Sequence, residues 1–272
     1  MSVSQRIVLD FNQIRGTFCR SLQHQLDVMT LLKGGSEVVT ATQAHESRGF
    51  LNFSPAHGAE LTHEESRNAA SEWLYGAFLR DALEHTGQFL IGALLYCEII
   101  NLSKIDDIDI EHLDKHMKST EERIKKHHFP ILLRKFEETT NSVLALSNSL
   151  LSLNKLRSCL VHRLGYVSEA DTNSDQCLRV EWMTLNTVIR GNISGTEIPA
   201  NAGVTITEES TLVSTVVMQA KDFPFGEKVR LEQLDIFSTI FTLMQFGRQC
   251  AESAERYALA SGIKSLEPQN GH

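Results

Sequence analysis

The stretch from Val143 to Val167, with the sequence VLALSNSLLSLNKLRSCLVHRLGYV, constrains the fold of this chain more than any other segment. Its apolar residues recur in steps of three and four, the period of one face of an α-helix. Gly165 predicts the end of this helix and places His162 in its last turn. A face this wide predicts a buried, leucine-rich helix, and its members are Val143, Leu146, Leu150, Leu153, Leu156 and Leu160.

A line of polar residues runs beside this apolar face. Asn154, Ser158 and His162 are spaced four apart and therefore stack on one side of the helix. Arg157 lies between the two lines, and because burial of an unpaired guanidinium costs several kcal/mol, we expect an anionic or carbonyl partner for it. On an ideal helix Arg157 and His162 point about 140° apart. They converge only if the helix distorts or ends there, or if a second copy of the chain supplies the other half.

The string LRSCLVHRLGYV, in which four residues separate Arg157 from His162, resembles the signature of the HEPN superfamily. HEPN domains are all-helical, and many are metal-independent endoribonucleases of toxin–antitoxin and antiphage systems. Their motif is an Arg and, a few residues later, a His at the end of a helix, usually with Asn or Asp directly after the Arg. Here Ser158 occupies that position. The resemblance implies a mainly α-helical, HEPN-like bundle.

The resemblance also implies a catalytic group made of Arg157, Ser158 and His162, with no metal and no cofactor. His162 would act as general base on a ribose 2′-hydroxyl or as general acid on the leaving 5′-oxygen. Arg157 would hold the scissile phosphate, and Ser158 would add a supporting hydrogen bond. The product would be a cyclic phosphate. We expect neighbouring polar and basic residues to bind the substrate, namely Asn154, Lys155 and Arg163.

Composition narrows the class of partner. The formal net charge of −8 argues against a surface coated in basic residues, and leaves room for a local basic patch on the leucine-rich helix. The N-terminal residues lack a secretory pattern, and no apolar run reaches transmembrane length. Five scattered cysteines without a C-x-x-C pair fit a reducing compartment. We therefore expect a cytoplasmic protein without membrane contact. Its expected partners are RNA, a second copy in a homodimer, and an antitoxin or other regulatory protein.

The order of patterns predicts a single domain over residues 1–272. Capping boxes at Ser2–Gln5 and Thr62–Glu65 predict two helix starts. Gly34 and Gly35 predict the end of the first helix, and residues 36–61 a polar loop or insert. Alternation and β-branched residues predict a small antiparallel β insertion over residues 176–220, and residues 265–272 a frayed tail.

Two further helices complete the prediction. Pro130 starts a helix that runs into the leucine-rich stretch. The final helix is expected to turn one apolar series inward, made of Leu231, Leu234, Phe237, Phe241 and Met244.

Two alternatives stay open. His112 and His116 have the i, i+4 spacing of metal ligands, but no matched third ligand accompanies them, so a solvated charged helix is the better interpretation and no metal site is expected. The alternative function is a catalytically silent helical module that binds a protein or a nucleotide. In that module Arg157 would be closed off against a carboxylate such as Asp81 or Glu84.

Overall fold

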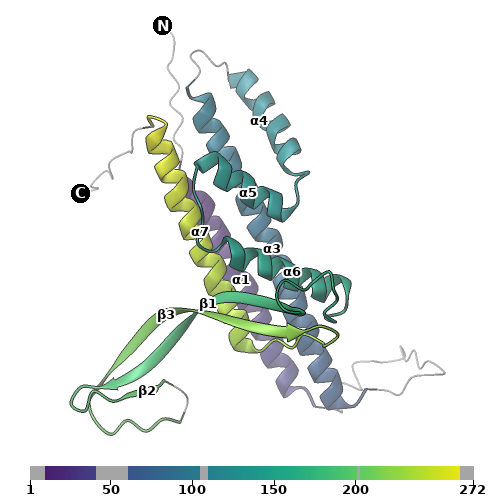
Figure 1. The fold of residues 1–272 in the computed structure, drawn as a ribbon, viewed down its shortest axis with the longest axis vertical. Helices are drawn as coiled ribbons and strands as arrows, with labels where there is room; N and C mark the ends of the chain where they lie inside the picture. The colour runs from purple at the N-terminus through teal and green to yellow at the C-terminus, as the bar shows by residue number, and fades with distance from the viewer. Residues whose placement is uncertain (1–9, 41–60, 105–109, 201–202, 264–272) are drawn as a thin grey trace, which may run out of the picture. The chain divides into compact units, whose positions relative to one another are not determined.

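The computed structural model describes residues 10–40, 61–104, 110–200 and 203–263. These residues form six helices and one three-stranded antiparallel sheet (Figure 1). The predicted fold class, mainly α with a small antiparallel β insertion, is confirmed. The chain divides into two compact units, residues 1–147 with 244–272, and residues 148–243. None of the described helices is long and apolar enough to cross a membrane.

The first unit is helical, and its helix starts follow from side-chain caps. Asp10 caps the first helix by accepting a hydrogen bond from the N–H of Asn12 at 2.9 Å. The capping box of Thr62 and Glu65 starts the second, as predicted, with reciprocal bonds of 2.8 and 3.2 Å. The helices of this unit are α1 (Phe11–Val38), α3 (His63–Leu102), α4 (Ile110–Ile124), α5 (Phe129–Thr140) and the second part of α7 (Gln233–Ala260).

The predicted end of α1 at Gly34 and Gly35 is wrong, because the helix continues to Val38. Each glycine costs a helix only about 1 kcal/mol, and Lys33 holds this turn in place. Its ammonium lies 3.0 Å from Glu37, one turn on, and 3.0 Å from the hydroxyl of Ser71 on α3. The predicted Ser2–Gln5 cap, most of the predicted 36–61 insert and the predicted 265–272 tail lie outside the described residues.

The helix expected to run from Pro130 into the leucine-rich stretch is interrupted. Asn141 adopts a left-handed conformation with φ 48° and ends α5. The carboxylate of Glu137 then accepts hydrogen bonds from the N–H of Leu144 and the hydroxyl of Ser147, at 2.9 and 2.7 Å. Helix α6 (Ser147–His162) therefore begins later than predicted, and Val143 is left 93% exposed. The rest of the apolar face is largely buried, through Leu146, Leu150, Leu153 and Leu156.

The second unit joins α6 and the first part of α7 to the sheet of β1 (Cys177–Gly191), β2 (Glu197–Pro199) and β3 (Ser210–Pro224). The strand order is β2-β1-β3, and β1 pairs with β3 along its whole length (Figure 1). Alternate residues at the start of β1 are buried, namely Leu178, Val180 and Trp182. Strand β3 runs on to Pro224, past the predicted limit of 220.

Two helices close the edge of β1 that faces away from β3. The N–H of Glu181 donates to the hydroxyl of Ser152 on α6 at 3.1 Å. The N–H of Met183 donates to the hydroxyl of Thr242 on α7 at 2.7 Å. These bonds give partners to two partly buried backbone donors at the edge of the strand.

The predicted inward face of the final helix is wrong in its first turns. Leu234 and Phe237 are 59% and 40% exposed. The buried residues there are Ile236 and Ile240 together with the polar Asp235, Ser238 and Thr239, and two of the polar ones bond to the sheet. Ser238 donates to the hydroxyl of Thr184 at 3.0 Å, and Asp235 pairs with Lys221 at 2.7 Å.

Candidate functional site

The end of α6 has the geometry that the sequence predicted for it. The helix ends at His162, whose side chain is exposed. Gly165 has φ 83° and donates its N–H to the carbonyl of Cys159 at 3.1 Å, which closes the helix end. Leu164, with φ 53°, also adopts a left-handed conformation, which is uncommon for a bulky residue.

Arg157 is half-buried on α6, and its Nε atom is buried without a hydrogen bond. Within the described residues of its own unit, Arg157 forms no ion pair. The two carboxylates considered as its partners bond to neighbours in the first unit. Asp81 accepts from Arg80 at 2.7 Å, and Glu84 accepts from Gln88 at 3.3 Å. Neither carboxylate therefore accepts a hydrogen bond from the Nε of Arg157.

Arg163, expected to bind substrate, is bound to Asp171. Its Nε donates to Asp171 Oδ2 at 2.6 Å, and its Nη2 contacts the other carboxylate oxygen. Asp171 is 1% exposed and also accepts from the N–H and the hydroxyl of Ser168, at 2.9 and 2.8 Å. Burial by itself raises the pKa of Asp171, but the hydrogen bonds from Arg163 and Ser168 outweigh burial and hold it below its ordinary value. Arg163 thus ties the end of α6 to the loop that follows it.

Lys155 makes a second link to the same loop by donating to the carbonyl of Thr172 at 2.8 Å. The side chains of Asn154 and Ser158 are half-buried on α6. Burial raises the pKa of the Cys159 thiol to about 11, which keeps it protonated. Of the six predicted site residues, Lys155 and Arg163 stabilise the loop, whereas Arg157 and His162 have no such bond within the described part of their unit.

Asp171 was missed in the sequence, although its signal was present. Ser168 and Asp171 have the Ser-x-x-Asp spacing of a capping box, in which the acidic side chain bonds back to the N–H three residues earlier. No long apolar run follows this pattern, so it does not predict the start of a helix.

His112 and His116 lie on α4, the helix that was predicted to be charged and solvated. His116 lies 2.7 Å from Glu98 of α3, with its side chain 45% exposed. Among the described residues, no group of three or more His, Cys, Asp or Glu side chains is placed to hold a metal ion.

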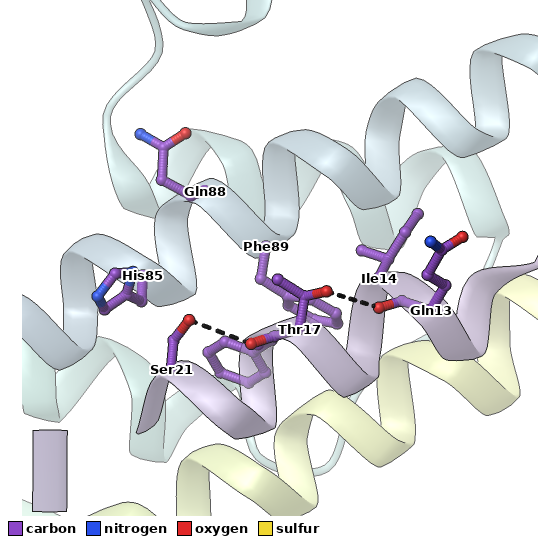
Figure 2. Close-up of a pocket in the computed structure, with 8 residues that line it drawn as sticks. Gln13, Ile14, Thr17, Ser21, His85, Gln88 and Phe89 are labelled. Atoms are coloured by element: carbon purple, nitrogen blue, oxygen red, sulfur yellow. Dashed lines mark hydrogen bonds between the residues drawn. The ribbon is translucent and has the colours of Figure 1, made fainter. Parts of the chain in front are cut away.

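A shallow pocket of about 400 Å³ lies between α1 and α3 in the first unit (Figure 2). Stacked rings of Phe18 and Phe89, with centroids 4.5 Å apart, contribute its apolar lining. Its two hydroxyl groups donate to their own helix, Thr17 to Gln13 and Ser21 to Thr17.

Comparisons of the chain with protein-family models, with curated proteins and with solved structures found no match.

Proposed function

We propose that this chain is a HEPN-like, metal-independent endoribonuclease that acts in the cytoplasm as a toxin or antiphage effector. The observation that carries the proposal is the unpaired Nε of Arg157, on the same helix as the exposed His162. A buried donor without a partner costs about 1–3 kcal/mol. A bound phosphate would recover that cost, since a guanidinium matches phosphate oxygens in charge and geometry.

The proposed reaction uses the 2′-hydroxyl of RNA. His162 takes the proton of this hydroxyl, and the 2′-oxygen bonds to the neighbouring phosphorus while the bond from phosphorus to the 5′-oxygen breaks. The leaving 5′-oxygen takes a proton from a water molecule, so each site needs a single His162. Arg157 stabilises the charge that builds on the phosphoryl oxygens. The products are a 2′,3′-cyclic phosphate and a 5′-hydroxyl, so DNA is not cleaved.

The proposed enzyme is a homodimer whose interface includes the Leu153–Tyr166 region. Three apolar or aromatic side chains near His162 are exposed, Val161 by 38%, Leu164 by 78% and Tyr166 by 54%. A second copy related by a two-fold axis would cover them. It would also bring Arg157 and His162 of different copies to one phosphate. An antitoxin or another regulatory protein would act by covering this surface.

The test is cleavage of an RNA oligonucleotide by the purified chain, with the all-deoxy oligonucleotide beside it. We expect RNA cleavage with cyclic phosphate ends and no DNA cleavage. Arg157→Ala should reduce the rate at least a hundredfold, the usual scale for one group that stabilises transition-state charge. The matched control is Arg134→Ala, since Arg134 is 68% exposed in a surface pair with Glu138. This control should retain full activity.

An intact, folded chain that leaves every RNA uncut would contradict the proposal and favour the catalytically silent module. Equal rates for Arg157→Ala and Arg134→Ala would contradict the role given to Arg157.

A further inference from the structure

The outer edge of β3 has no strand paired to it among the described residues. Glu181 and Met183 of β1 direct their N–H groups away from β3, to Ser152 and Thr242. In an antiparallel pair, two opposite residues either both point their N–H and C=O groups toward the partner strand or both point them away from it. Ala220 and Met218 lie opposite them, so their N–H and C=O groups point away from β1. The same holds for every second residue of the strand.

Over residues 211–220, this outer edge lacks the features that normally keep edges from pairing. Residues 211–220, TLVSTVVMQA, contain no charge and no proline, and the register with β1 runs without a bulge. Natural edge strands carry lysine, proline or bulges for this purpose. Three of the residues whose N–H and C=O groups point away from β1 also have exposed apolar side chains. Leu212 is 65% exposed, Val216 51% and Met218 54%. The unpaired N–H and C=O groups of such an edge can pair with a further extended strand.

We propose that β3 pairs with β3 of a second copy of this chain, antiparallel and about a two-fold axis at Val216. This register places Leu212 opposite Ala220 and Ser214 opposite Met218. The N–H and C=O groups of residues 212, 214, 216, 218 and 220, which point away from β1, then bond to the second copy. Together they form roughly ten main-chain hydrogen bonds. The charged residues that directly follow the paired segment meet hydroxyls, since Lys221 faces Thr211 and Asp222 faces Ser210. No like charges oppose each other.

A second copy fits this edge because the apolar face continues across the axis. Residues opposite each other in paired strands project to the same face of the sheet. Val216 of each copy would therefore meet its counterpart, beside Leu185 of β1, which lies opposite Val216 in the register and is 51% exposed. The β3 strand is thus complementary to itself in hydrogen bonding, in charge and in apolar surface. This inference does not rest on the ribonuclease proposal, which concerns α6.

The test compares the mass of the full chain in solution with that of two variants, by sedimentation equilibrium over a range of concentrations. Val216→Pro removes one outward N–H and blocks the edge, yet breaks no bond to β1. Val216→Ala is the matched control that shortens the side chain and keeps the N–H. We expect the mass of Val216→Pro to fall to half or less of the wild-type mass, and Val216→Ala to stay associated. A proline variant with the wild-type mass would overturn the proposal, as would a wild type without association.

A cross-link provides a second measurement that does not depend on the proline variant folding. At a two-fold axis, Val216→Cys would place two thiols on strands with Cα atoms about 5.5 Å apart, within disulfide range. Under mild oxidation we expect a covalent dimer from Val216→Cys. Asn186→Cys, an exposed position on the inner strand β1, should give none beyond the wild-type background. Equal cross-linking of both variants would overturn the proposed register.

Discussion

Both hydrogen-bonding nitrogens of Arg163, Nε and Nη2, contact the carboxylate of Asp171, which is 1% exposed. This pair distinguishes the basic residues of α6. Arg163 and Lys155 attach the helix to the loop of residues 168–172, whereas Arg157 has no partner for its Nε in the described part of its unit. Arg163 stabilises the fold through its pair with Asp171. Arg157, whose Nε is unpaired, is the better candidate to bind a phosphate.

The first prediction concerns pH. Because the pKa of Asp171 is held below its ordinary value, its ionised form stabilises the folded state at pH values above the unfolded pKa, about 3.9. This stability is lost as the pH falls through the lower, folded value. Asp171→Asn should lower the free energy of unfolding at pH 7 by about 2 kcal/mol. It should also remove part of the acid sensitivity below about pH 4.

The measurement is urea unfolding at pH 7 and at pH 3, followed by tryptophan fluorescence. Trp182 is fully buried in the same unit as Asp171, whereas Trp73 is 70% exposed, so the signal reports mainly on this unit. The control is Asp114→Asn, which removes an exposed pair with Lys118 and should change little. A variant and a wild type with equal loss of stability on acidification would contradict the role of Asp171.

The second prediction concerns the edge of β1. Thr242→Val leaves the partly buried N–H of Met183 without an acceptor and should destabilise the chain by about 1 kcal/mol. Thr239→Val is the matched control, because its buried hydroxyl donates only to the carbonyl of Asp235 in its own helix. Urea unfolding midpoints would show the difference. Equal midpoints for the two variants would mean that the bond to Met183 contributes nothing.

The third prediction concerns metals. The proposed chemistry uses side chains and water and needs no metal ion. RNA cleavage should therefore proceed at the same rate after exhaustive treatment with EDTA. Activity lost on chelation and regained with a divalent ion would refute the proposed mechanism.

The fourth prediction ranks two residues of the polar line on α6. His162→Ala should abolish cleavage with little effect on the fold, because the side chain is exposed at a helix end. Ser158→Ala should reduce the rate about tenfold, the equivalent of one ordinary hydrogen bond. Circular dichroism would establish that both variants are folded. If Ser158→Ala were as inactive as His162→Ala, this ranking would be wrong.

The sequence was sufficient where one local signal decides the structure. The leucine period of α6, the Thr62–Glu65 capping box and Gly165 each predicted an element or its end, because their causes lie within a few residues. The β insertion was likewise legible from alternation.

The sequence misled where a distant partner decides. The break before α6 depends on Glu137, whose carboxylate accepts from Leu144 and Ser147. The inward face of α7 depends on strand β1, because the N–H of Met183 needs an acceptor and Thr242 supplies it. Such pairings leave no periodic trace in the chain. The unpaired Nε of Arg157 is of the same kind, since the motif named the residue but not its surroundings.

The most direct measurement of the central claim mixes two inactive variants. If one active site takes Arg157 from one copy and His162 from the other, Arg157→Ala and His162→Ala should each be inactive alone. After unfolding and refolding together in equal amounts, half of the dimers are mixed and one of their two sites is intact. The mixture should therefore recover about a quarter of the wild-type rate of RNA cleavage, by the symmetry of a two-fold dimer. A mixture as inactive as either variant, beside an active wild type treated in the same way, would contradict the account.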